Sequence, residues 1–288
     1  MGVSQNQVAV AGKRPEYTVV RIEAHCGWLG LDLPELWAYR ELLYFFVWRD
    51  IKVRYKQTVI GAAWAILQPL MTMLVFSLFF GRLAKIPSQG LPYPIFYYCA
   101  LLPWTYFATA VQAATNVVVE HQRVITKVYF PRVILPISSV VSGLLDFAIS
   151  FVVLICMMFY YRIVPTKAVI WLPFFTLLAV LTALGVGLWL SALNALYRDV
   201  RYVLPFLVQF WMFASPVAYP SSLVPAKWRG LYGLNPMTGV IEGFRWALTG
   251  HGQPPGALMA ASSAAVVLLV LGGLIYYHAV EGKMADVV

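Results

Sequence analysis

The chain has 288 residues, of which 61% are hydrophobic and only 11% are charged. Soluble domains carry about 25% charged residues, so this composition argues against an ordinary soluble domain and indicates an all-α integral membrane protein. The formal charge of +9 comes from 21 Lys and Arg against 12 Asp and Glu. Most of these cations lie beside apolar segments, where membrane orientation explains them better than nucleic-acid binding. We therefore expect membrane lipids and no nucleic acid as partners.

The N-terminal part of the chain leads from a polar segment to a dense basic cluster. Residues 1–33 are expected to be a cytoplasmic tail. Residues 34–50 are rich in Trp and Tyr and form an imperfect amphipathic pattern, which predicts a helix at the membrane interface; a buried cytoplasmic helix is the alternative. Within the unit 34–58, four cations follow this pattern directly before the first apolar run: Arg49, Lys52, Arg54 and Lys56.

Apolar stretches long enough to cross a bilayer follow along the rest of the chain. A spanning helix needs about 20 mainly apolar residues. Six stretches meet this requirement: 59–80, 94–118, 133–160, 169–196, 203–219 and 257–277.

An even number of spans places both termini on one side of the membrane. With the termini inside, the inner segments hold 14 Lys and Arg and the outer segments hold 7. Because inner loops carry the excess of Lys and Arg, we expect both termini to be cytoplasmic, with 281–288 as a C-terminal tail.

The inner segment between the second and third stretches has helical spacing. Arg123 and Lys127 are four residues apart, as are Val124 and Val128, so a short helix would have a cationic edge next to an apolar edge. Pro131 ends it. This segment is shaped to meet a partner, and an ordinary solvated connector is the alternative.

The outer segment 220–256 is too long for a structureless loop. Asn235 can cap a helix, Pro236 suits its first turn and Gly250 can end it. At about 13 residues this helix is too short to span. We expect it to enter the outer leaflet and return, forming an outer mouth or gate.

Chemistry for catalysis or energy conversion is missing from the sequence. It contains no GxxxxGK[ST] phosphate loop, no HExxH motif and no Ser/His/Asp set. Its Cys and His residues lack metal-ligand spacing, so we expect neither catalytic residues nor a metal site. Asp146 is the clear acid within a span: either a proton site, or hydrogen-bonded inside the bundle or facing a wet cavity. A conduit driven by another chain fits best.

Aromatic residues make up 15% of the chain, and many lie toward the predicted outer ends of spans. They form either an aromatic belt at the interface or a path of flat faces on which sugar rings could stack. Composition leaves both interpretations open.

Four ordered segments resemble one known family: WRDIKVRYKQTVIGAAWAILQPLMTMLVF (48–76), YFPRVILPISSV (129–140), NALYRDVRYVLPFLVQFWMFASPVAYP (194–220) and LYGLNPMTGVIEGFRWAL (231–248). These segments resemble type-2 ABC exporter permeases, in particular the branch that exports O-antigen, teichoic acid and related lipid-linked polysaccharides. The similarity extends over about residues 35–280.

The resemblance implies an architecture and a set of partners. It implies a transmembrane domain over 59–280, with six spans, an interfacial helix, a cytoplasmic coupling helix and re-entrant outer helices between spans five and six. Two copies would form a homodimer in the cytoplasmic membrane. They would pair with two copies of a separate ATPase that binds ATP and Mg, so this chain would be a permease without enzymatic activity or cofactor of its own.

The resemblance also implies where the functional residues lie. The substrate would be a polysaccharide on polyprenyl pyrophosphate. The coupling helix would present Glu120, Arg123, Val124, Lys127, Val128 and Tyr129 to the ATPase. From charge position, Arg49, Lys52, Arg54 and Lys56 would receive the pyrophosphate, unless they only orient the chain. The expected glycan path and outer gate comprise Gln68, Trp104, Phe210, Trp211, Trp228, Tyr232, Glu242, Arg245 and Trp246.

Two other functions stay open. The chain could export drugs or small lipids on the same fold, or it could be an ion-coupled carrier that uses Asp146 and has no ATPase.

Overall fold

A computed structural model describes residues 33–56, 61–252 and 256–287, and every regular element in these ranges is a helix. The predicted tail 1–33 falls outside these ranges except for Leu33, which begins the first helix. In chain order the helices of the first half are α1 (Leu33–Ala38), α2 (Arg40–Lys56), α3 (Gly61–Phe76), the π-helix η1 (Ser77–Leu83), α4 (Tyr93–Glu120), α5 (Gln122–Ile125), α6 (Ile134–Ser142) and α7 (Leu144–Tyr160).

The second half contains long helices and a compact group of short ones. In chain order these are the 3₁₀ turn η2 (Lys167–Trp171), α8 (Leu172–Leu196), α9 (Val200–Ala214), the 3₁₀ turns η3 (Ser221–Leu223) and η4 (Ala226–Trp228), α10 (Arg229–Gly233), α11 (Pro236–Thr249) and α12 (Ala257–Val287). Helix α12 therefore continues through most of the segment predicted as a C-terminal tail.

The prediction of an all-α membrane protein is confirmed. Within the described residues, four helical segments are long and apolar enough to cross a membrane: Ala63–Leu83, Ile134–Tyr160, Lys167–Leu196 and Ala257–Gly282. Helix α4 has 28 residues but carries more polar groups, and α9 is apolar but has only 15 residues. The count of six spans stays a prediction.

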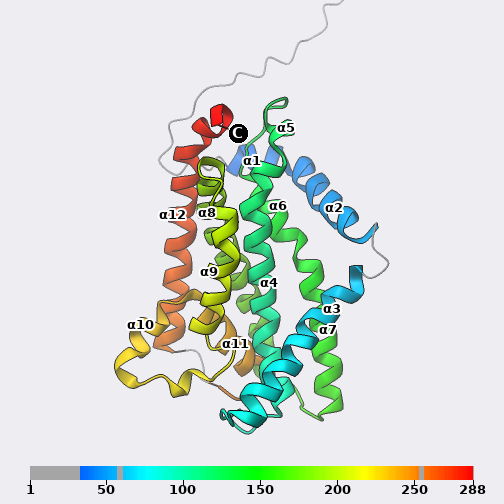
Figure 1. Cartoon of the computed structure of the whole chain (residues 1–288), viewed down its shortest axis with the longest axis vertical. Coiled ribbons are helices and arrows are strands. Elements are labelled where there is room, and N and C mark those ends of the chain that lie inside the picture. The colour runs from blue at the N-terminus through cyan, green and yellow to red at the C-terminus, as the bar shows by residue number, and fades with distance from the viewer. Residues whose placement is uncertain (1–32, 57–60, 253–255, 288) are drawn as a thin grey trace, which may run out of the picture.

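The long helices lie side by side along the longest axis of the molecule. Helix α8 packs against both α4 and α12. The C-terminal end of α12 lies at the same end of the bundle as α1 and α5, whereas α10 and α11 lie at the opposite end (Figure 1). This arrangement agrees with the expectation that the coupling segment and the C-terminus share one side of the membrane.

Glycines allow α8 and α12 to approach closely. A Cβ placed on Gly273 would stand 2.8 Å from the carbonyl oxygen of Gly185. Next to this contact the rings of Trp189 and Tyr276 stack with centroids 4.7 Å apart. Small residues bring membrane helices together because dispersion packing, rather than the hydrophobic effect, drives their association.

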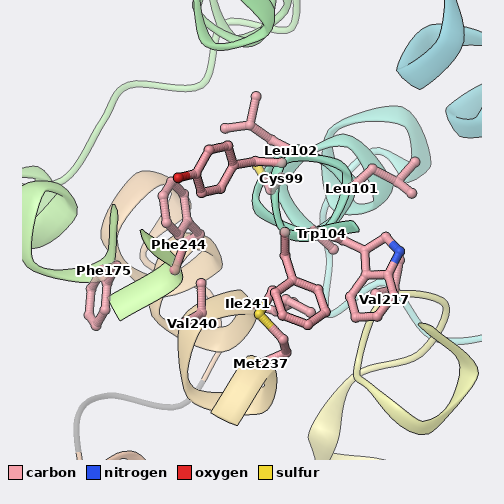
Figure 2. Close-up of a cluster of buried hydrophobic side chains, with 14 of the residues drawn as sticks. Cys99, Leu101, Leu102, Trp104, Phe175, Val217, Met237, Val240, Ile241 and Phe244 are labelled. Atoms are coloured by element: carbon pink, nitrogen blue, oxygen red, sulfur yellow. The ribbon is translucent and has the colours of Figure 1, made fainter. Parts of the chain in front are cut away.

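Helix α11 forms as predicted and lies in the core. The Asn235 side chain accepts a hydrogen bond from the backbone N–H of Met237 at 3.1 Å, Pro236 occupies the first turn, and Gly250 ends the helix with φ = 71°. Figure 2 shows side chains of this helix packed beside residues of α4 such as Cys99, Leu101, Leu102 and Trp104. Met237, Ile241, Phe244 and Leu248, which recur at helical spacing, are at most 2% exposed.

The third predicted stretch, 133–160, is present as the apolar segment Ile134–Tyr160, but it is not one continuous helix. It breaks at Gly143, between α6 and α7. The hydroxyl of Tyr106 donates to the carbonyl of Val140 at 3.1 Å, the group that the N–H of Leu144 would use in an uninterrupted helix. Gly143 leaves room for the Tyr106 ring, which would stand 3.3 Å from a Cβ at this position. The interruption therefore comes from a neighbouring helix.

The fifth predicted stretch, 203–219, also differs. Helix α9 ends at Ala214, and Ser215 is extended with ψ = 156°. The reason is Pro216, because the residue before a proline avoids the helical conformation. The backbone then turns toward α11.

The coupling helix is shorter than expected. Helix α4 ends at Glu120, and α5 has only four residues before a non-helical segment at 126–131. The last backbone bonds of this turn run from the N–H groups of Lys127 and Val128 to the carbonyl of Val124, at 3.1 Å each, and Pro131 disfavours the helical conformation at Phe130. The expected helix through residue 130 is therefore wrong, although a short helix, α5, does form between α4 and α6.

Candidate functional site

A charged cluster joins the end of α2 to α7. Helix α2 runs obliquely from the α5 end of the molecule toward the middle of the bundle, and α3 begins there (Figure 1). At this junction one carboxylate oxygen of Asp146 accepts a hydrogen bond from the Arg54 guanidinium, and the other accepts from the Tyr55 hydroxyl. Both oxygens of the acid found within the third span are thus engaged.

This cluster borders a cavity of about 500 Å³ between α2, α3, α4 and α7. Its volume falls in the range of small-molecule sites, about 300–1,000 Å³. Apolar walls come from Trp64, Ala65, Pro69, Leu102, Tyr106 and Phe147. Polar groups come from Arg54, Gln68, Thr105, Thr109, Asp146 and Ser150. The arrangement can hold an amphiphile with its charged end near Arg54.

The four cations predicted to receive pyrophosphate occupy different surroundings. Arg49 pairs with Asp50 at 2.7 Å and lies over the ring of Phe46, and the Lys52 ammonium lies over the Trp48 ring. Lys56 is exposed at the end of α2. Of these four residues, Arg54 alone lines the cavity.

The coupling segment exposes a mixed apolar and cationic tip. Val128 and Tyr129 are 56% and 61% exposed, and Arg123 and Lys127 are exposed beside them. Glu120 is exposed at the end of α4, and Val124 is half-buried. Residual burial and the nearby carboxylates of Glu35 and Glu281 raise the pKa of the Tyr129 phenol, so it stays a neutral donor. An apolar pair bordered by cations can dock into a hollow that carries acids.

Contacts with α2 and α12 fix the base of this tip to the bundle. The ring of Phe130 lies 5.7 Å from that of Phe46 on α2. The backbone N–H of Arg132 donates to the Glu281 carboxylate at 3.0 Å, and its guanidinium donates to the Glu281 carbonyl. The Tyr277 hydroxyl donates to the Arg132 carbonyl at 3.1 Å. We call Arg132, Tyr277 and Glu281 the cytoplasmic clasp; no sequence motif signals it.

Two predicted gate residues, Glu242 and Arg245, form a buried ion pair. Their charged groups are 3.2 Å apart, and the side chains are 4% and 0% exposed. Arg245 also donates to the carbonyls of Pro216 and Val217, and its guanidinium lies 3.9 Å from the centre of the Phe96 ring. These contacts tie the segment after α9 to α11 and α4.

A further bond reinforces this pair. The Glu242 carboxylate accepts from the backbone N–H of Ser221 at 3.1 Å. Both members are therefore held by backbone groups in addition to each other. Within the described residues, the second Glu242 oxygen and Arg245 Nε are buried without a hydrogen-bond partner.

The aromatic residues predicted for the glycan path divide between core and surface. Trp104 is 4% exposed and packs on Phe107. Trp211 also packs on Phe107 and donates to Asn235 at 3.0 Å.

The remaining predicted path residues lie nearer the surface. Tyr232 is half-buried and donates to the Tyr219 hydroxyl, and Trp246 is half-buried too. Phe210 and Trp228 are 65% and 55% exposed, and Gln68 is also exposed. Their role in a path stays a prediction.

Helices α3 and α9 present broad apolar faces. The exposed side chains of α3 include Trp64, Leu67, Met71, Leu74 and Val75. Those of α9 include Tyr202, Val203, Phe206, Leu207, Phe210 and Phe213. In a membrane protein such faces meet lipid or another protein surface.

Comparisons with known proteins agree with this architecture. A family model described as ABC-2 type transporter matches residues 41–249. The O-antigen export system permease protein RfbA of Myxococcus xanthus is 33% identical over 223 residues, covering 76% of this chain and 85% of that protein. RfbA of Klebsiella pneumoniae is 26% identical over 206 residues, covering 71% and 79%.

A more distant relative has a different named cargo. The polysialic acid transport protein KpsM of Escherichia coli is 24% identical over 202 residues, covering 67% of this chain and 76% of that protein. The family match covers more than half of the chain and includes α2, the coupling segment and α11. The resemblance inferred from the sequence is thereby confirmed, and the chain belongs to the ABC-2 type transporter family.

Proposed function

We propose that this chain is the membrane-spanning subunit of an ABC exporter that moves a polysaccharide, carried on polyprenyl pyrophosphate, across the cytoplasmic membrane. One observation carries the substrate class: relatives aligned over two thirds or more of the chain are named as permeases for O-antigen or as a transporter of polysialic acid. The cavity beside Arg54 supports it, because guanidinium groups bind phosphates well.

The energy would come from a separate ATPase that holds ATP and Mg. The sequence has no phosphate loop, and the exposed tip offers a docking element. Val128 and Tyr129 would fill an apolar hollow in the ATPase, while Arg123 and Lys127 would meet acidic groups at its edge. Both termini would lie on the cytoplasmic side with this tip.

Two copies of the chain would form the transport path. The apolar faces of α3 and α9 are broad enough to meet the same faces of a second copy, and two-fold dimers are the commonest symmetric assembly. The path would run between the two copies. Phe210 would face it from α9, and Trp228 would lie near its outer mouth.

The contacts at the tip indicate how the ATPase would act on this path. ATP-driven closure of the ATPase pair would displace the tip. The cytoplasmic clasp would pass that displacement to α12, and the contact between Phe130 and Phe46 would pass it to α2. Movement of α2 would shift Arg54 relative to Asp146 and release the lipid head group. The glycan would follow through the path between the copies.

Complementation tests this proposal in the host. Deleting the gene is expected to remove the polysaccharide from the cell surface and to leave it inside the cell, and a plasmid copy is expected to restore it. Replacing both Val128 and Tyr129 by Ser should abolish rescue, whereas Tyr160→Ser, at an exposed aromatic far from the tip, should rescue fully. Normal surface polysaccharide in the deletion strain would overturn the proposal.

A second candidate, export of drugs or small lipids, is favoured by the cavity alone. About 500 Å³ suits one small amphiphile. Stimulation of the coupled ATPase by small amphiphiles but not by lipid-linked glycans would select this alternative.

A further inference from the structure

A cation at the middle of a membrane bundle faces a competition problem. Every phospholipid around the protein carries a phosphodiester, and a guanidinium binds phosphate strongly. If Arg54 receives the phosphate of a rare lipid-linked substrate, it must reject these abundant competitors. The structure already places an anion on Arg54, the carboxylate of Asp146.

The setting of this ion pair distinguishes it from a structural one. Its side chains are 37% and 28% exposed and line the cavity, whereas those of Arg245 and Glu242 are 0% and 4% exposed. The second oxygen of Asp146 is held by Tyr55, so the carboxylate has a support that does not depend on Arg54. Arg54 can therefore exchange its anion while Asp146 stays in place.

We propose that Asp146 is a built-in competitor that makes Arg54 selective for a pyrophosphate over the phosphodiesters of bulk lipids. A phosphodiester carries one charge and gains little by replacing a carboxylate that is already positioned. A pyrophosphate between a lipid and a glycan carries a charge on each phosphorus, so it attracts Arg54 more strongly. This inference rests on the proposed function and assigns its selectivity to one acid.

The cavity accommodates the other end of such a ligand. Trp64, Leu102, Tyr106 and Phe147 supply apolar walls for the first part of a polyprenyl chain. Arg54 lies at the same cavity, so head group and chain would be held together.

A competition experiment tests the selectivity. The purified full chain is placed in uncharged maltoside micelles with a radiolabelled polyprenyl pyrophosphate that bears one sugar. Binding is then measured while phosphatidylglycerol is added. The variants are Asp146→Asn, Arg54→Gln and Asp50→Asn. The last removes the carboxylate of the Arg49–Asp50 pair on α2, which does not line the cavity, so it is the matched control.

The proposal predicts a specific pattern. Wild type and Asp50→Asn should keep most of the bound probe as phosphatidylglycerol is added. Asp146→Asn should bind the probe at least as well as wild type in pure detergent. Added phosphatidylglycerol should then lower its affinity for the probe about tenfold more than it lowers that of wild type, a factor that corresponds to one charge-assisted hydrogen bond. Arg54→Gln should bind weakly in both. Surface charge from the added lipid affects all variants alike, so the difference between them reports the site.

Several outcomes would overturn the inference. Equal sensitivity of wild type and Asp146→Asn to phosphatidylglycerol would make Asp146 a structural partner only, with the proposed function intact. Unchanged binding by Arg54→Gln would place the phosphate elsewhere. Failure of wild type to bind the probe at all would remove the proposed substrate class as well. If Asp146→Asn elutes as an aggregate, Asp146→Ser carries the same prediction because it also removes the charge.

Discussion

Two arginine–carboxylate pairs lie in opposite surroundings. Arg245 and Glu242 are almost fully buried, and backbone groups bind both of them, so neither charge can leave without stranding the other in the interior. Arg54 and Asp146 are about one third exposed and border a cavity. The same chemical pair therefore serves as a fixed support in one place and as an exchangeable contact in the other, because enclosure and backbone bonding decide whether a partner can be replaced.

Removing the enclosed arginine should have the largest effect. Arg245→Ala leaves the Glu242 carboxylate buried without its cation and frees two carbonyls. We expect a loss of about 3–5 kcal/mol in the free energy of unfolding, measured by thermal melting in detergent. Arg229→Ala is the control, since Arg229 bonds only to carbonyls at an exposed position. If Arg245→Ala melts with wild type, the pair is not a support.

Crowding the contact between α8 and α12 should have the next largest effect on stability. It tests whether these helices, like the Arg245–Glu242 pair, are held in a fixed arrangement. In Gly273→Ala the new methyl group would stand 2.8 Å from the Gly185 carbonyl oxygen. Overpacking of this kind destabilises by about 1–3 kcal/mol. Gly230→Ala, where nothing lies within 4 Å of the new atom, should melt like wild type. Equal melting temperatures for both variants would show that the helices can separate freely.

Weakening the cytoplasmic clasp should have an effect on stability between those of removing Arg245 and removing Arg54. Glu281→Gln weakens one charge-assisted bond to the Arg132 backbone at a carboxylate that is 26% exposed, so the loss of stability should be about 1 kcal/mol. Its larger effect should be fewer glycan chains exported per ATP hydrolysed, because the tip would move without α12. Glu41→Gln, at an exposed position in the first turn of α2, should keep the wild-type ratio. If Glu281→Gln exports as many glycan chains per ATP hydrolysed as wild type, the clasp takes no part in coupling ATP hydrolysis to export.

The exchangeable arginine should have the smallest effect on stability. Arg54→Gln removes a partly exposed pair, and such pairs contribute within about 1 kcal/mol. Export should nevertheless fall sharply in vesicles. Lys52→Gln should export more than Arg54→Gln, because the Lys52 ammonium lies over the Trp48 ring and away from the cavity. A large drop in melting temperature for Arg54→Gln would show that Arg54, like Arg245, is a fixed structural support.

Local signals in the sequence predicted the elements that depend on local chemistry. The cap, first turn and end of α11 follow from Asn235, Pro236 and Gly250, and the structure has all three. In the segment predicted to meet a partner, Arg123, Lys127, Val128 and Tyr129 are exposed. The helix expected to continue through residue 130 was wrong, because the residue before Pro131 avoids the helical conformation.

Contacts between distant parts of the chain could not be predicted in this way. Arg54 and Asp146 are 92 residues apart, and Arg132 and Glu281 are 149 residues apart. The break at Gly143 depends on the Tyr106 ring from another helix. Trp104 and Phe210 have similar apolar character, yet one lies in the core and the other on the surface of α9. Packing decides these cases.

ATP-dependent transport by the purified pair tests the central claim most directly. The chain and its ATPase would be reconstituted into vesicles with the ATP-binding side outward, and lipid-linked polysaccharide would be added outside. The account predicts that ATP makes the glycan resistant to an external glycosidase, and that omitting the ATPase or the permease prevents this. ATP hydrolysis that leaves all of the glycan accessible, or protection without the ATPase, would contradict it.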